Sequence, residues 1–232
     1  MLKKLLALCF LVFSSHLMAA EMRDAQVAME HGNNKLAKKI MTELAEKNDP
    51  LAQMYLASWY TTGARDGSKP DLKKAVYWFE KCTALVVCKL ELAKLLGEGK
   101  GAPKDTQRAL DLYKAVIDFD VKWPEGKDEA RVKAGLIYFT EKKYKDRDEA
   151  ERLFAIAASH GNSNAQFWTG VVTQMKQPPE AHLVEAYKFF YLANSKEKHY
   201  NAISAMESLE KKMTRAEVEQ AKEWANAWSP TE

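Results

Sequence analysis

The chain has 232 residues, of which 47% are hydrophobic and 29% are charged, and its formal net charge is +3. Acidic and basic residues are interspersed, so the sequence lacks the basic stripe that nucleic-acid binding requires, and we expect no nucleic-acid partner. The apolar content is sufficient for one compact domain or one repeat array, which argues against a disordered chain.

The first 20 residues have the layout of a secretory signal peptide. Met1 to Lys4 form a short basic start, Leu5 to Phe13 an apolar core, and Ser14 to Ala20 a stretch that ends in small residues. This apolar core is too short for a transmembrane helix. A buried N-terminal helix is the alternative interpretation.

Cleavage of this peptide is expected after Ala19 or Ala20. Its two lysines leave with it, so the net charge falls from +3 to about +1. No later apolar run has the length of a membrane span. We therefore expect a protein without a membrane span, located in the periplasm or secreted.

The rest of the sequence repeats one pattern with a period of about 36 residues, which is typical of helix–turn–helix repeats. Small residues at helical spacing let two helices approach closely, and large apolar residues fill the space beside them. The clearest copies are Ala52-x3-Leu56-Ala57-x2-Tyr60-x2-Gly63 with Asp71-x3-Ala75-x2-Trp78-Phe79, and Cys88-x3-Leu92-Ala93-x2-Leu96-x2-Gly99 with Asp105-x3-Ala109-x2-Leu112-Tyr113. No segment has the period-two alternation of a strand long enough to build a sheet, so the predicted fold is all-α.

The repeats predict an α-solenoid over residues 21–228. Individual repeats are expected at approximately 22–48, 49–84, 85–118, 128–161 and 162–196, a capping helix at 200–228, and a tail at 229–232.

Several residues mark helix boundaries in this pattern. Asp71 after Pro70, and Asp105 after Pro103, predict a turn followed by an N-cap. Thr214 and Glu217 predict a capping box in the last helix. Trp224 and Trp228 lie on the same face of that helix, and we expect both in the core.

One string, Gly99-x-Gly101-x-Pro103-x-Asp105-x3-Ala109-x2-Leu112-Tyr113, resembles the Sel-like repeat, a relative of the tetratricopeptide repeat. The copy at 162–196 departs from the pattern, because Gln177-Pro178-Pro179 replaces the loop glycines. The resemblance implies a right-handed α-solenoid of about five repeats. It also implies a secreted or periplasmic bacterial protein that binds other proteins and is not an enzyme.

Two cysteines, Cys82 and Cys88, remain after removal of the signal peptide. They flank a tight turn between helices, so their Cα atoms can come within disulfide range, and an oxidising compartment favours the bond. Cysteine-rich relatives in the family are similar in this respect. Two buried free thiols are the alternative, and a metal pair is disfavoured because no other ligand lies close in sequence.

The candidate catalytic residues do not form a known catalytic motif. His31, His160, His182 and His199 fall at turns or helix ends, and no HExxH, GxSxG or phosphate-binding Gly-Lys-Ser/Thr motif occurs. The glycines at 97–101 follow a helix and not a strand, so they predict a turn and not a nucleotide loop. We expect no catalytic residue, cofactor or metal site.

A partner-binding face follows from the resemblance, because the first helix of each tetratricopeptide-like copy lines the concave face. Positions two and six residues after the first small residue are then expected to face a partner: Met54, Ser58, Leu90, Lys94, Val132, Leu136, Phe167 and Val171. Burial of these side chains in the core is the alternative. The insertion at 119–126, with Trp123, is a second candidate surface.

The predicted function is a periplasmic protein-interaction module, with a monomeric chain that binds a secreted toxin, as an immunity protein does, or an envelope enzyme. A scaffold for envelope enzymes is the alternative. A hydrolase of cell-wall fragments or β-lactams is a weaker one, which rests on the resemblance alone.

Overall fold

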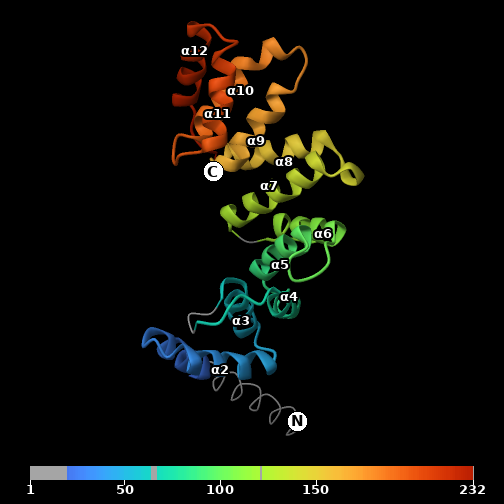
Figure 1. Ribbon diagram of the computed structural model, residues 1–232, viewed down its shortest axis with the longest axis vertical. Coiled ribbons are helices and arrows are strands. Elements are labelled where there is room, and N and C mark those ends of the chain that lie inside the picture. The colour runs from blue at the N-terminus through green and yellow to red at the C-terminus, as the bar shows by residue number, and fades with distance from the viewer. Residues whose placement is uncertain (1–19, 64–66, 121, 232) are drawn as a thin grey trace, which may run out of the picture. The chain divides into compact units, whose positions relative to one another are not determined.

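The computed structural model describes residues 20–63, 67–120 and 122–231 (Figure 1). Every regular element in these ranges is helical, which confirms the all-α prediction. The expected signal peptide lies outside them, apart from its last residue. None of the described helices is long and apolar enough to cross a membrane. The chain divides into two compact units, residues 1–112 and 113–232.

The first unit is a succession of short helices, each packed on the next. Residues 20–30 are helical and precede α2 (Asn34–Glu46), α3 (Pro50–Thr62), α4 (Leu72–Lys81) and α5 (Val86–Glu98). Helix α6 (Thr106–Ile117) begins in this unit. The contacts run from α2 to α3, α3 to α4 and α4 to α5.

The second unit continues this arrangement after α6. Its helices are α7 (Pro124–Thr140), α8 (Arg147–Ser159), α9 (Ser163–Gln174), α10 (Leu183–Ala193), α11 (Tyr200–Glu210) and α12 (Arg215–Asn226), with short 3-10 turns η1 (Lys142–Tyr144) and η2 (Pro179–His182). Helix α7 packs on α8, α8 on α9, and α9 on α10, which also receives α11 and α12.

The repeating small residues of the sequence pattern are the contact points between helices. One fully buried set consists of Ala37, Ala52, Ala75, Cys88, Ala109, Ala130, Ala150, Ala165 and Ala186. Large side chains beside them are equally buried, among them Phe79, Phe154 and Phe190. As predicted, small apolar residues let successive helices approach closely, and large apolar residues fill the space beside them.

The predicted N-caps are confirmed. The Asp71 side chain accepts a hydrogen bond from the Lys74 amide at 3.1 Å, and Asp105 accepts one from the Arg108 amide at 3.0 Å. Each aspartate thereby satisfies an amide that has no partner inside its helix. The capping box of α12 is also present, and the Thr214 amide that donates to Glu217 lowers the pKa of that carboxyl.

Two buried glutamines link consecutive helix pairs, a device that the sequence analysis did not anticipate. Gln53 Nε2 donates to the Ala45 carbonyl at 3.1 Å, and Gln166 Nε2 donates to the Ala158 carbonyl at 3.5 Å. Each glutamine directly follows the small residue of a first helix and reaches the end of the preceding helix. Each of these carbonyls also accepts from a backbone amide of the turn that follows, Asn48 or Gly161, so the glutamine adds a second donor and ties the next helix to that turn.

The glycines after α5 form the turn that the sequence predicts. Gly99 has φ 68° in the left-handed region, and its amide donates to the Leu96 carbonyl at the end of α5. Gly101 has φ 79°, and its Cα lies against the Leu72 backbone carbonyl. Any Cβ at Gly101 would collide with that carbonyl, so the close approach of the loop to α4 requires glycine.

Three expectations need correction. The capping helix at 200–228 is two helices, because α11 ends at Glu210 and Thr214 starts a new one. Trp224 is 48% exposed and not a core residue, because the buried stripe of α12 consists of Ala221 and Ala225. The insertion at 119–126 is shorter than expected, since Pro124 already begins α7.

A disulfide joins Cys82, at the end of α4, to Cys88 in the first turns of α5, with Cα atoms 5.8 Å apart. The predicted pairing is thus present, and both side chains are fully buried. The bond closes a small loop, which restricts the unfolded chain by about 2 kcal/mol in the loop-closure account.

We predict that the double variant Cys82→Ala/Cys88→Ala loses about 2 kcal/mol of unfolding free energy, measured by urea denaturation without reductant. Dithiothreitol is expected to lower the stability of the unmodified chain to a similar extent. The same reductant must leave the variant unchanged. A variant that still responds to dithiothreitol would contradict the assignment of the effect to this bond.

Glycine at two first-helix positions permits close contacts between helices in the second unit. A Cβ built on Gly135 would lie 2.7 Å from Phe154 Cε1, and one on Gly170 would lie 2.7 Å from Phe190 Cε1. Both rings are fully buried and cannot move aside. At Gly97, by contrast, a Cβ would meet only the Ala109 methyl group at 3.4 Å.

We therefore predict opposite outcomes for two identical substitutions. Gly135→Ala is expected to cost about 1–3 kcal/mol of unfolding free energy, because overpacking displaces the Phe154 ring. Gly97→Ala is expected to be neutral or to stabilise by about 0.5 kcal/mol, because alanine favours the helix. Thermal and urea denaturation measure both, and equal losses in the two variants would show that packing against Phe154 is not decisive.

Candidate functional site

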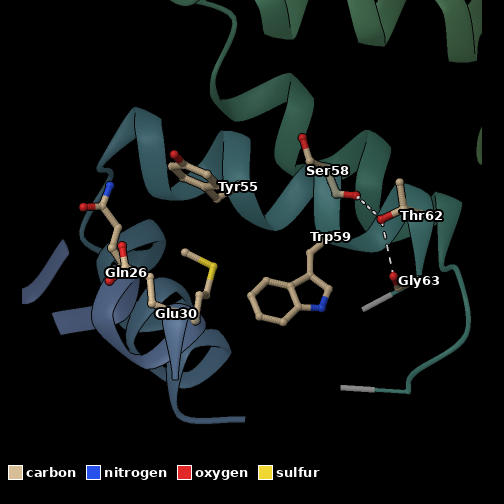
Figure 2. Close-up of a pocket in the computed structure, with 8 residues that line it drawn as sticks. Gln26, Glu30, Tyr55, Ser58, Trp59, Thr62 and Gly63 are labelled. Carbon is tan, nitrogen blue, oxygen red and sulfur yellow. Dashed lines mark hydrogen bonds between the residues drawn. The ribbon is translucent and has the colours of Figure 1, made fainter. Parts of the chain in front are cut away.

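The first candidate site is a hollow of about 570 Å³ between the helical segment 20–30 and α3. It is lined by Gln26, Met29, Glu30, Tyr55, Ser58, Trp59, Thr62 and Gly63. Figure 2 shows the Trp59 indole in the space between the two helices, with Gln26 and Glu30 on the opposite wall. We call this feature the N-terminal hollow.

Helix α3 presents one side to its neighbours and another to this hollow. Asp49 caps the helix by accepting from the Ala52 amide at 2.8 Å, and Pro50 occupies its first turn. The buried face consists of Ala52, Gln53, Leu56 and Ala57. Tyr55, Trp59 and Thr62 follow one another at helical spacing beside that face, so they form one wall of the hollow.

Trp59 gives the N-terminal hollow its chemical character. Its indole Nε1 is buried and has no hydrogen-bond partner among the residues that the structure describes. Buried tryptophan N–H groups usually find an acceptor, because leaving such a donor unsatisfied costs about 1–3 kcal/mol. The site therefore combines an aromatic surface, including the 37% exposed Tyr55, with one indole donor that lacks an acceptor.

The only charged side chain that lines this hollow, within the described part of the chain, is Glu30. It is exposed and lies on the wall opposite Trp59 (Figure 2). A cationic group of a ligand at this edge could pair with the Glu30 carboxylate.

A second hollow, of about 790 Å³, lies in the second unit at the start of α7. It is lined by Lys122, Trp123, Pro124, Glu125, Lys127, Asp128, Arg131, His160, Gly161, Asn162, Lys196 and Thr231. We call it the α7 hollow. Four of its side chains are cationic at neutral pH and two are carboxylates, so the lining carries a net positive charge.

Asp128 is the buried centre of the α7 hollow, with its side chain only 5% exposed. Arg131 Nη1 donates to its Oδ1 at 2.6 Å, and His160 Nδ1 lies 2.9 Å from both carboxylate oxygens. These contacts join α7 to the residue that follows α8. Because burial of an isolated carboxylate is costly, the arrangement requires this pairing.

Trp123 packs over the start of α7. Its indole ring lies directly on the Cα of buried Gly126, where any side chain would collide with it. Trp123 is also the N-cap residue of α7, and no described side chain caps this helix end. Pro124 has no N–H, so the donor capacity at this helix end comes from the amides that follow it, beginning with Glu125.

The predicted partner-facing residues differ in their exposure. Leu90 is 1% exposed and Val132 is buried, so both pack between helices and offer little surface to a partner. Others are half-buried in helix contacts: Met54, Lys94, Leu136, Phe167 and Val171. Ser58 is exposed in the N-terminal hollow, and Trp123 lines the α7 hollow. Partner binding by any of them stays a prediction.

The half-buried residues have structural contacts of their own. Lys94 pairs with Glu91 at 3.0 Å, one helical turn away. The Phe167 ring stacks on His199 with centroids 4.9 Å apart and also contacts Phe190. Val171 and Phe167 pack against the core formed by α10, α11 and α12. These contacts correspond to the alternative interpretation, in which the side chains belong to the core.

Sequence reasoning missed Tyr55 and Trp59, although the pattern contained a signal for both. They follow Ala52 by three and seven residues, so they share a helix edge that the chosen positions, two and six residues after Ala52, do not include. It also missed Asp128 with His160, because the two residues lie 32 positions apart.

No group of three or more histidine, cysteine, aspartate or glutamate side chains that could hold a metal ion occurs among residues 20–63, 67–120 and 122–231.

The role of Asp128 can be tested by stability measurements. Asp128→Asn keeps the size of the side chain and removes its charge, so Arg131 and His160 lose their shared counter-charge. We predict a loss of about 2 kcal/mol in unfolding free energy, measured by urea denaturation. The exposed Asp24→Asn is the matched control and should change stability by less than about 0.5 kcal/mol. Equal effects at the two positions would contradict a structural role for the buried carboxylate.

Comparisons with known proteins found one matching family model and several similar solved structures. No curated protein sequence matches the chain. A Sel1 repeat protein from Oxalobacter formigenes has a similar structure, with a TM-score of 0.64, 22% identity, and coverage of 90% of this chain and 87% of the other. This likeness shows the fold alone.

Two further solved structures are more distant. One is a protective antigen present in uropathogenic Escherichia coli strains (TM-score 0.39, 18% identity, 90% of this chain and 60% of the other). The other is an immunity protein from Pseudomonas aeruginosa (TM-score 0.43, 17% identity, 91% and 84%).

The sequence model of the Sel1 repeat matches residues 50–82, 87–115 and 129–162. These segments coincide with the helix pairs α3–α4, α5–α6 and α7–α8. Three segments of the chain therefore match the Sel1 repeat, as the resemblance in its loop glycines and paired helices predicted.

Proposed function

We propose that this chain is a protein-binding adaptor or inhibitor whose partner inserts a segment into the N-terminal hollow. Sel1 repeats are generally interaction modules and not enzymes, and no catalytic family is indicated by the matches. The single observation that carries the proposal is the buried Trp59 Nε1 in an open, aromatic hollow.

The chemistry of the hollow specifies the kind of segment. Tyr55 and Trp59 offer flat apolar surface, and such residues dominate the energetics of protein interfaces. A main-chain carbonyl of the partner would accept from Trp59 Nε1 once the indole turns toward it, and a lysine or arginine would pair with Glu30. A helix or extended segment that carries an apolar and a basic side chain meets all three requirements.

We place this activity in the periplasm or outside the cell. The basic, apolar and small-residue order of residues 1–20 supports export, and a disulfide between Cys82 and Cys88 is compatible with an oxidising compartment. The partner is then an exported protein, such as a secreted toxin or an envelope enzyme.

A dedicated partner fits this hollow better than a set of interchangeable ones. One unsatisfied donor beside a fixed aromatic wall selects a single matching geometry, because any partner without the acceptor leaves the indole N–H buried and unpaired. This favours a one-to-one complex, as an immunity protein forms with its toxin, over a scaffold that holds several enzymes.

The test begins with a photocrosslinking amino acid at Tyr55, in the hollow, and at Tyr200, which is exposed on α11. In cells that produce the full chain, Tyr55 is expected to give one dominant crosslinked protein that Tyr200 does not give. Crosslinks of equal pattern at both positions would contradict the proposal.

Affinity measurements with that partner complete the test. Ser58→Arg fills the hollow with a long cationic side chain and is expected to weaken binding at least tenfold, because it blocks the site and repels the basic group. Ser204→Arg makes the same change at an exposed position of α11 and should alter the dissociation constant less than twofold. Unaltered binding by Ser58→Arg would overturn the proposed site. Sedimentation of the complex then distinguishes a one-to-one inhibitor from a multivalent scaffold.

A further inference from the structure

We infer that the α7 hollow is a second binding site, which takes an acidic segment of a polypeptide. The inference does not depend on the N-terminal hollow, because every lining residue belongs to the second unit. It stands on the excess of cations over carboxylates in one open hollow, on an aromatic side chain beside them, and on the size of that hollow.

The lysines of the α7 hollow form no ion pair with its carboxylates in the described part of the chain. Asp128 is engaged by Arg131 and His160, so it does not neutralise the lysines around it. Lys122 and Lys127 have no ion pair in the described part of the chain. Lys196 Nζ donates only to the Gly161 carbonyl, at 3.5 Å.

Gathered cations in a concavity have a larger effect than the same charges on a convex surface. The protein walls limit screening by water, so the positive potential is concentrated in the hollow. A carboxylate that enters exchanges water for charge-assisted hydrogen bonds with ammonium groups. The uncapped start of α7 adds to this potential, because the amino end of a helix carries partial positive charge.

The dimensions favour a peptide over a small inorganic anion. About 790 Å³ is within the range of pockets that enclose a multi-residue or drug-sized ligand. Trp123 and Pro124 supply apolar surface, which a phosphate ion cannot use but the methylene groups of glutamate side chains can cover. Two or more carboxylates on one segment can meet Lys122, Lys127 and Lys196 together.

The walls are fixed in advance, which lowers the ordering cost of binding. The Thr231 amide donates to the Ser159 carbonyl at 2.8 Å, and this bond holds the C-terminal tail at the rim. Asp128 ties α7 to His160, as described above, and Asn162 caps α9 by accepting from the Ala165 amide at 3.0 Å.

The experiment is calorimetric titration of the full chain with a blocked hexaglutamate peptide, and with hexaglutamine as the uncharged probe. We expect hexaglutamate to bind, with an affinity that falls as salt rises, and hexaglutamine not to bind. The variant Lys122→Glu/Lys127→Glu is expected to weaken hexaglutamate binding at least tenfold. The control Lys211→Glu/Lys212→Glu makes the same charge change at exposed positions of the same unit and should alter affinity less than twofold.

Four results would overturn the inference: no hexaglutamate binding by the unmodified chain, equal loss in variant and control, displacement of the peptide by inorganic phosphate beyond that of sodium chloride at equal ionic strength, or tighter binding of a single-stranded oligonucleotide through the same lysines. Circular dichroism confirms that both variants fold. Ser58→Arg should leave hexaglutamate binding intact, so failure of the N-terminal hollow and failure of the α7 hollow are separate outcomes.

Discussion

The close approach of helices through alanine and glycine is the constraint on which the rest of this protein depends. Gly135 and Gly170 lie against the fully buried rings of Phe154 and Phe190, and Ala57 and Ala93 occupy the equivalent repeat positions without exposed surface. Because the spacing between helices is set by these pairs, the neighbouring side chains on each first helix have fixed positions. The N-terminal hollow and the α7 hollow lie beside such contacts and not within them.

The sequence was sufficient for features that depend on local chemistry. Asp71, Asp105 and Thr214 cap their helices as predicted, because an N-cap needs only a short polar side chain and the amides that follow it. The same holds for Cys82 and Cys88, which are six residues apart in one turn. The period of the alanines predicted the helix pairs for a similar reason.

Features that depend on neighbouring helices were not predictable to the same extent. Leu90 was placed on a binding face by its register, yet α5 is buried on more than one side and Leu90 with it. Trp224 shares a helical stripe with Ala221 in a projection of the sequence, but the contact with α10 is narrow and leaves the indole exposed. Asp128 and His160 meet only through the packing of α7 on α8. A single sequence contains the helix period but not the width of each contact.

Two of the residues that follow the first small residue of a copy lie in the candidate sites. In two copies the residue after the first small residue is a glutamine, Gln53 or Gln166, that reaches the end of the preceding helix. The equivalent residue after Ala130 is Arg131, which pairs with Asp128 in the α7 hollow. After Ala25 it is Gln26, which is exposed and lines the N-terminal hollow. Where the residue at this position does not bond to the preceding helix, its side chain can line a site. The two sites differ in charge, with Glu30 in one and four cations in the other.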